Sequence, residues 1–307
     1  MFTTLISQIF IMFLLMGFGV LASKLKIIRR ESSDDLTALL INIISPALIV
    51  MALQRPITDD ILHIIFLVGL GVVAIYLIEI VISHLTFSKL SNIDSRRSAI
   101  FASVYNNVGF IGIPLVSAVI GQDGVLYAVI SMIVYNIFCW THGSSLFQPD
   151  LSVGDRIRSI FLNPNVIAII IGLCLFFTST NIPSIIGNTL TYLGNANTPL
   201  SMLIIGFTLA NARLKKETFN KTVLTSVLYR NIVFPLLSML VFKLIGLEGI
   251  NYTASLLIAA CPAPSLVVIF TIQAKGNTDD AVAEVGLSTL FSLISIPFIF
   301  AISNFLF

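Results

Sequence analysis

Charged side chains are scarce in this sequence. Asp, Glu, Lys and Arg make up 10% of its 307 residues, whereas a soluble protein of this length carries about 25%. Hydrophobic residues make up 57%, and the mean hydropathy is +1.01. We therefore expect an integral membrane protein, with the lipid bilayer as its main surroundings.

Sequence motifs that would indicate other functions are missing as well. The basic residues are few and lie in short loops, which argues against a nucleic-acid partner. No glycine-rich loop with a lysine is present, so this chain alone is not expected to use ATP. The absence of HExxH and of a pair of intramembrane aspartates disfavours a protease. We expect no catalytic residues, no enzymatic activity and no cofactor.

Metal-binding patterns are also lacking. The three cysteines, Cys139, Cys174 and Cys261, fall inside apolar segments and have no metal-ligand spacing. They are predicted to be buried thiols. The three histidines have no ligand spacing either, so no metal site is expected.

The long apolar runs predict membrane spans, each of which needs about 20 mainly apolar residues. Ten stretches qualify, and the seventh is polar in its first half: 2–23, 34–54, 61–85, 99–121, 125–147, 164–180, 183–210, 222–245, 252–274 and 284–306. The first stretch has no basic residues before it, which favours a retained helix over a signal peptide. The expected fold class is an all-α integral membrane protein.

The distribution of Lys and Arg predicts the orientation. The loops after spans 1, 3, 5, 7 and 9 hold 4, 3, 2, 4 and 1 of them, whereas the opposite side holds only Arg55. Because basic residues collect in cytoplasmic loops, both termini are expected to lie outside. The expected location is the cytoplasmic membrane, crossed many times.

Two pairs of proline sites suggest an internal repeat. Pro46 and Pro199 lie 153 residues apart, and Pro114 and Pro264 lie 150 apart. These nearly equal distances predict a five-helix repeat over 1–147, a cytoplasmic linker over 148–163, and a second five-helix repeat over 164–307. With an odd number of spans in each half, the two repeats must be inverted. Inverted repeats with interrupted helices are typical of secondary transporters.

Spans 4 and 9 are predicted to be broken at their centres. Span 4 contains "NNVGFIGIP" (106–114), and span 9 contains "CPAPS" (261–265). Proline removes a backbone donor and disfavours helical geometry before it. Freed backbone groups are tolerated only beside protein or a water-filled cavity. Each second half-helix is expected to start near Pro114 or Pro264, and its positive end favours an anion.

These breaks define the candidate site. The residues predicted to bind a substrate are Asn106, Asn107, Gly109, Gly112, Pro114, Pro262, Ala263, Pro264, Ser265 and Arg230. Further residues are candidates for lining the same cavity: Asn42, Ser45, Pro46, Asn195, Asn197 and Thr198. Their alternative role is hydrogen bonding between helices.

Two charged residues inside predicted spans, Arg230 and Glu79, are candidates for a functional role. Arg230 either takes part in the site or extends to the membrane interface. Glu79 is expected at the interface, with a role as partner for a cation or proton as the alternative. No carboxylate lies near either break, which argues against a cation substrate. Coupling to Na⁺ or H⁺ stays open, because half-helix C-terminal ends can hold a cation.

These segments resemble the auxin efflux carrier family over essentially the whole chain. The resemblance is strongest in "NNVGFIGIPLV" and extends to "AACPAPSLVVIFTIQAKGNTDDAVAEVGLSTLFSLISIPF". It implies a fold similar to bile acid symporters and sodium–proton antiporters, with Asn107, Gly112 and Pro114 in one crossover and Pro262 and Pro264 in the other. The linker of about 16 residues is similar to the bacterial branch of malate and malonate permeases.

The sequence thus predicts a secondary transporter of a small organic anion, a mono- or dicarboxylate, working by alternating access. A membrane sensor that binds a small carboxylate without net transport is the alternative from another class. A passive channel and an intramembrane enzyme are weaker alternatives. A homodimer is also considered, and the sequence does not decide it.

Overall fold

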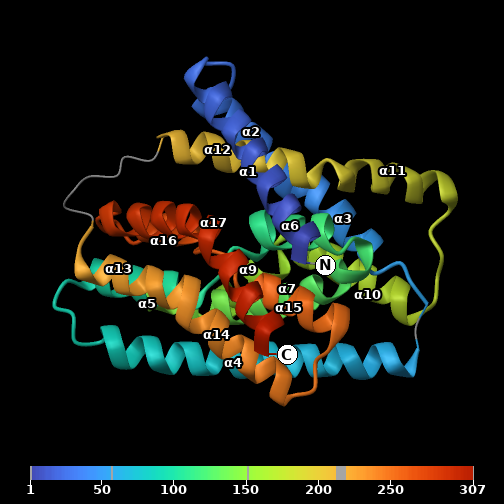
Figure 1. Cartoon of the computed structure of the whole chain (residues 1–307). Coiled ribbons are helices and arrows are strands. Elements are labelled where there is room, and N and C mark those ends of the chain that lie inside the picture. Colours follow the sequence, from blue (N-terminus) through green and yellow to red (C-terminus); the bar gives the residue numbers. More distant parts are fainter. Residues whose placement is uncertain (1, 57, 151, 212–218, 307) are drawn as a thin grey trace.

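Helices form every regular element of the described chain. The computed structural model describes residues 2–56, 58–150, 152–211 and 219–306, and these ranges contain no strand. Figure 1 shows the helices packed against one another in a single body. The prediction of an all-α protein is confirmed for these residues.

The bounds of the helices follow the predicted apolar stretches closely. In chain order they are α1 (Phe2–Lys24), α2 (Arg30–Leu39), α3 (Ser45–Ala52), α4 (Asp59–Phe87), α5 (Ile93–Val104), α6 (Ile113–Val119), α7 (Gln122–Phe138), α8 (Ser144–Phe147), α9 (Val153–Phe161), α10 (Pro164–Phe177), α11 (Ser184–Asn195), α12 (Asn197–Asn211), α13 (Lys221–Leu228), α14 (Phe234–Leu244), α15 (Gly249–Ala259), α16 (Leu266–Gln273) and α17 (Asp279–Leu306). Wider π-helical turns connect some of them: η1 (Leu40–Ile44), η2 (Val108–Gly112), η3 (Cys139–Gly143) and η5 (Tyr229–Val233).

Seven helical stretches of the described chain are long and apolar enough to cross a membrane. They are Ile6–Lys24, Arg30–Ala52, Asp60–Phe87, Ile93–Val119, Gln122–Phe147, Lys221–Leu244 and Asp279–Leu306. The count rises to eight if α9 and α10, which meet at 68°, form one broken span. The chain is therefore a multi-pass membrane protein. The count of ten is not confirmed, because α11 and α12 are separate helices and span 9 consists of α15 and α16.

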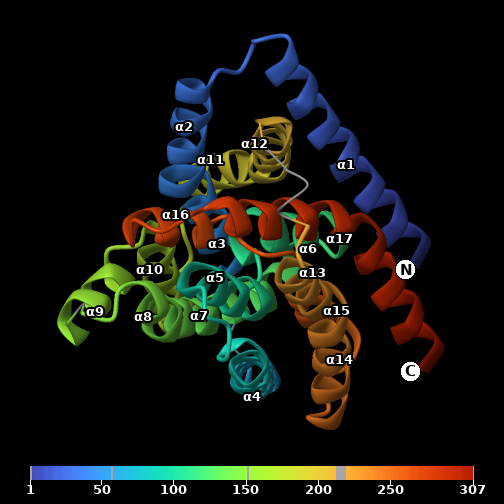
Figure 2. The ribbon, with the colours of Figure 1, turned by 90° about the vertical axis from the view of Figure 1, so that its left-hand side faces the viewer.

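The helices pack in two groups. In the first, α1 packs along α12, and α3 packs against α10 and α11. In the second, α4 packs against α5, α7 and α14, while α17 packs against α5 and α13. Figures 1 and 2 place α12 and α4 on opposite sides of the molecule, with α5, α7 and α15 between them.

The interrupted span 4 lies at the centre of the protein. In its most apolar window 89% of the residues are buried, compared with 22% for the first span. Its helix stops at Val104, and Tyr105, Asn106 and Asn107 are not helical. Span 9 is interrupted from Ala260 to Ser265. Both predicted interruptions are therefore present, and protein surrounds the first one on almost all sides.

Prolines follow three of the π-helical turns at the same distance. Pro46, Pro114 and Pro235 are each the second residue after η1, η2 and η5. Proline has no N–H and its ring clashes with the carbonyl four residues earlier. A wider turn moves that carbonyl away, so the helix continues through the proline. This corrects the prediction that a half-helix starts near Pro114, because the helical turn already begins at Val108.

Two further details differ from the expectation. The predicted linker 148–163 contains helix α9, whose first turn is capped by the hydroxyl of Ser152. Cys139 and Cys261 are buried as predicted, whereas Cys174 is exposed. In a membrane protein, a residue in an apolar segment can face the lipid. An apolar segment therefore does not by itself predict that a cysteine is buried inside the protein.

Candidate functional site

The two interrupted helices touch at their breaks. The backbone N–H of Asn107 donates to the carbonyl oxygen of Pro262 at 2.7 Å. The side-chain amide of Asn106 donates to the carbonyl of Ile258 at 2.6 Å. In an unbroken helix the Ile258 carbonyl would accept from residue 262, but proline has no N–H to donate. Asn106 thus supplies a donor that the break in the other helix removes.

Asn106 is part of the framework of this crossing. Its side chain is 5% exposed, and its Oδ1 accepts a hydrogen bond from the hydroxyl of Tyr76 at 2.8 Å. Tyr76 is itself buried on α4. Both polar atoms of Asn106 are therefore bonded within the protein, which fits the helix-bonding role better than ligand binding.

Asn107 ends the break and starts the second half of span 4. Its Oδ1 accepts from the N–H of Phe110 at 3.1 Å, as a helix N-cap does. Its backbone oxygen accepts from the N–H of Gly112 at 2.9 Å. Its side-chain nitrogen makes no hydrogen bond to a described residue. Among the predicted site residues, Asn107 thus keeps a donor at the N-terminal end of the half-helix.

Gly112 lies where the two broken helices are closest. A Cβ added there would lie 2.6 Å from Cδ1 of Ile258 and 3.5 Å from Sγ of Cys261. Gly109 has more room, since the nearest atom is 3.9 Å from such a Cβ. Pro114 is buried, and its carbonyl accepts from the hydroxyl of Thr198 at 3.4 Å. Gly112 therefore allows the crossing, and Thr198 links α12 to it.

The second break is held by span 10. The backbone N–H of Ala263 donates to the hydroxyl of Ser288 at 2.9 Å, and this hydroxyl donates to Oδ1 of Asn231 at 2.6 Å. Pro264 is buried, whereas Ser265 is exposed at the start of α16. Ser265 is thus the residue of this break that a ligand can reach.

Arg230 binds the ends of both first half-helices. Its guanidinium donates to the carbonyls of Ser103 and Val104, at 3.1 and 2.6 Å, and to that of Ala259 at 2.6 Å. Its Nη1 also lies 3.6 Å from Oε2 of Glu79. Arg230 is 1% exposed and Glu79 2%, so both are buried inside the protein and neither side chain extends to lipid or solvent.

The last carbonyls of a helix lack partners and carry partial negative charge. Arg230 meets two such ends at once, with four contacts that come from three different helices. The sequence identified Arg230 as a candidate, but the carbonyls that it meets lie 29 to 127 residues away along the chain. Its position makes it a structural cation of the crossing.

A cavity of about 720 Å³ lies beside the second break. Side chains from the start of α2, the end of α12, α16 and the start of α17 line it: Arg30, Ser33, Asp34, Phe207, Thr208, Leu209, Asn211, Ser265, Val268, Ile269, Val282, Val285 and Gly286. Ligand cavities commonly measure about 300–1,000 Å³, so a small organic molecule fits. The lining mixes hydroxyl and amide groups with an apolar floor.

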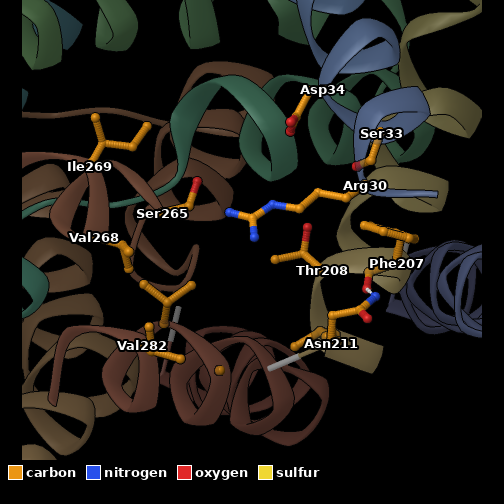
Figure 3. A pocket seen from close by; sticks show the side chains of 13 residues that line it. Arg30, Ser33, Asp34, Phe207, Thr208, Asn211, Ser265, Val268, Ile269 and Val282 are labelled. Atoms are coloured by element: carbon orange, nitrogen blue, oxygen red, sulfur yellow. Dashed lines mark hydrogen bonds between the residues drawn. The ribbon is translucent and has the colours of Figure 1, made fainter. Parts of the chain in front are cut away.

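Arg30 is the cation in this cavity. Figure 3 shows its guanidinium extending from α2 toward Ser265. It forms no hydrogen bond or ion pair within the described chain, and Asp34 on the next turn of α2 does not pair with it. The N-terminal end of α2 adds partial positive charge on the same side. The sequence did not identify Arg30, because it stood among four basic residues after the first span.

A much smaller cavity of about 10 Å³ lies behind Asn106, beside Tyr76 and Glu79. This volume is about the minimum for one water molecule. An organic anion therefore cannot bind there, whereas the cavity of about 720 Å³ has room for one.

The remaining predicted lining residues separate into two groups. Asn42 and Pro46 line a different, mostly apolar hollow, and Asn195 is exposed. Ser45 and Asn197 are buried, and no polar side-chain atom of either has a hydrogen-bond partner in the described chain. Buried polar atoms without partners are uncommon and require an explanation. Because α12 packs against η1 and η2, Asn197 lies on the segment that faces the crossing.

Within the described ranges no group of three His, Cys, Asp or Glu side chains could hold a metal ion. The sequence reasoning missed Arg30, Tyr76, Asn231 and Ser288. Serine and tyrosine in apolar helices cannot be recognised as site residues from the sequence alone. Such residues also occur where they bond to their own helix backbone or face lipid.

Comparison with known proteins places these features in context. A family model described as "Membrane transport protein" matches residues 4–157 and 151–300. An uncharacterized transporter of Methanothermobacter thermautotrophicus is 26% identical, over 91% of this chain and 92% of that protein. An uncharacterized transporter of Methanocaldococcus jannaschii is 24% identical, over 94% and 95% of the two chains. The first range of the family match contains the interrupted span 4, and the second range contains span 9.

Proposed function

Because the chain belongs to the membrane transport protein family, that of the auxin efflux carriers, we propose that it is a secondary transporter of a small organic anion. The proposed substrate is a mono- or dicarboxylate such as malate or malonate. It would cross the cytoplasmic membrane by alternating access. We assign no catalytic role and no cofactor to the chain.

One observation carries the choice of an anion. The cavity of about 720 Å³ contains the guanidinium of Arg30, which pairs with no described residue and is aimed at the exposed break residue Ser265. A guanidinium binds a carboxylate through two parallel hydrogen bonds. The free side-chain donor of Asn107 and the N-terminal ends of the two second half-helices support the same charge preference.

The proposed movement follows from the two groups of helices. The group with α4, α5, α7, α15 and α17 would move against the group with α1, α3, α11 and α12. The cavity lies between them, since α2 and α12 provide one wall and α16 and α17 the other. We propose two inverted five-helix repeats, 1–147 and 164–307, as the basis of this movement, with both termini outside. We also propose ten spans and leave a homodimer as a further possibility.

Uptake into proteoliposomes tests the proposal. Labelled malonate and malate are offered together with malonamide, a neutral analogue of similar shape. We expect saturable uptake of the acids, no competition by malonamide, and at least a tenfold loss of kcat/KM in Arg30→Gln, which is about 1.4 kcal/mol. Arg30→Lys should retain part of the uptake.

Arg29→Gln is the matched control, since Arg29 is exposed beside Arg30 and does not line the cavity. Equal losses in both variants would show that only general surface charge matters. Binding of the acids without any exchange would favour the sensor function instead.

A further inference from the structure

Glu284 is a buried carboxyl group that forms no hydrogen bond or ion pair with any described residue. It lies on α17, is 0% exposed, and neither of its oxygens has a hydrogen bond to a described residue. A buried charge is strongly disfavoured unless it is paired or neutralised. Its position, on the second turn of α17, is beyond the reach of the helix N-terminal charge, which fades within the first turn. A structural role does not explain this residue.

Oxygen atoms from three helices surround it. The hydroxyls of Ser98 on α5 and Ser226 on α13 lie beside the carboxyl, and Ser226 Oγ has no hydrogen-bond partner either. Asp280, one turn earlier on α17, accepts from the hydroxyl of Ser95 at 2.5 Å and from the amide of Asn220 at 2.9 Å. Carboxylate and hydroxyl oxygens are the ligands that hard cations prefer.

Among the residues that the structure describes, no basic side chain forms an ion pair with this cluster. Four cations lie on the elements packed against α17 here: Arg96, Arg97, Lys221 and Arg230. Within the described ranges none of them forms an ion pair with Glu284 or Asp280. Arg230 is bonded to the ends of α5 and α15 instead. Two carboxyl groups one turn apart therefore share a site to which the described residues contribute no positive charge.

The crossing itself offers no equivalent place for a cation. In transporters with broken helices, the C-terminal ends of the half-helices can coordinate Na⁺ or H⁺. Here the guanidinium of Arg230 occupies both ends, at 2.6 Å from the carbonyls of Val104 and Ala259. The uncompensated negative charge lies at Glu284, away from the two breaks.

We propose that Glu284, with Asp280, Ser98 and Ser226, binds a monovalent cation, Na⁺ or a proton. This cation would be the coupling ion of the transporter, a role that rests on the proposed function. Asp280 is half-buried and Glu284 fully buried, so the cation enters past Asp280.

The cation site is connected to the crossing through α17. Ser288, one turn beyond Glu284, accepts from the N–H of Ala263 in the second break at 2.9 Å. Ser98 lies on α5, which ends at the first break. Neutralising the charge of Glu284 changes the stability of the packing between α5, α13 and α17. Both breaks adjoin these helices. Cation binding therefore acts on the element that the substrate contacts.

The thermal unfolding of the purified full-length protein tests the cation site without any carboxylate in the buffer. The midpoint is measured in sodium chloride and in choline chloride of equal ionic strength, and in choline chloride over a pH series. If Na⁺ binds, the wild-type midpoint rises by a few degrees and saturates with Na⁺. If a proton binds, the midpoint falls as the pH rises and does not respond to Na⁺, because the folded state then has to keep a proton that the unfolded state releases.

Glu284→Gln should abolish whichever response the wild type shows. It should still fold, since it removes an unpaired buried charge. Ser226→Ala should weaken a Na⁺ response but leave a proton response intact. Glu31→Gln, which changes an exposed glutamate on α2, is the matched control and should behave like the wild type. A wild type that responds to neither cation, or a Glu284→Gln protein that responds as the wild type does, would overturn the proposal.

Malonate uptake driven by a Na⁺ or pH gradient separates this inference from the proposed function. Wild-type protein should accumulate malonate along with the gradient, and Glu284→Gln should only equilibrate it. If no carboxylate is transported while the Glu284-dependent stabilisation persists, the proposed substrate fails and the cation site stands.

Discussion

At the scale of single residues, Arg230 shows what holds a crossing of broken helices together. Two helices that end inside the protein expose carbonyls that need donors. Arg230 supplies donors to three carbonyls, and Glu79 is its counterion at 3.6 Å. The sequence indicated that Arg230 is a candidate functional residue, because it is charged and lies inside a predicted span. It could not show which carbonyls it meets, because they are distant along the chain.

We expect Arg230→Met to destabilise the protein by about 3–5 kcal/mol, because it leaves Glu79 unpaired and buried. Arg230→Met combined with Glu79→Gln should recover part of this loss, since the uncompensated charge is then gone. Thermal unfolding of the two single variants and the double variant measures the coupling between them. Strictly additive losses would show that the pair does not act as a unit.

At the scale of elements, the contact between α1 and α12 depends on two glycines. Gly19 and Gly206 face each other, and a Cβ added to Gly206 would collide with the carbonyl oxygen of Met16. Small residues allow such close approach between membrane helices. The apolar pattern predicted both helices, but it did not predict that they would pack together.

Gly206→Ala should therefore lower the stability by about 1–3 kcal/mol, because the two backbones must move apart. Gly17→Ala is the control in α1, since a Cβ there has nothing within 4 Å. Alanine has a higher helix propensity than glycine, so Gly17→Ala should be neutral or slightly stabilising. Thermal midpoints of the two variants in the same detergent give the comparison. A Gly206→Ala protein as stable as Gly17→Ala would contradict the close packing.

At the scale of the whole molecule, long apolar runs made the helices predictable. Span 3 was predicted over 61–85 and α4 covers Asp59–Phe87, while span 10 was predicted over 284–306 and α17 covers Asp279–Leu306. Interrupted spans are harder to predict, because a proline does not mark the exact residue at which the helix breaks. In span 4 the break precedes Pro114, and a π-helical turn accommodates the proline.

The candidate site was predictable in part for a related reason. Asn107 and Pro262 were recognisable, since poor helix formers are conspicuous in an apolar helix. The structure brings them together through the bond between Asn107 and Pro262. Arg30 and Glu284 lacked such a signal, because charged residues near the ends of spans are ordinary. Only the three-dimensional packing shows that one faces a cavity and the other is buried.

The central claim is that the cavity beside the crossing binds a small carboxylate and that the protein moves it across the membrane. Malonate counterflow in proteoliposomes, with wild type, Arg30→Gln and Arg29→Gln compared, tests it most directly. We expect saturable exchange by the wild type and by Arg29→Gln, and at least a tenfold lower kcat/KM for Arg30→Gln, since the guanidinium that faces the cavity is lost. Unchanged exchange and unchanged affinity in Arg30→Gln would contradict the claim.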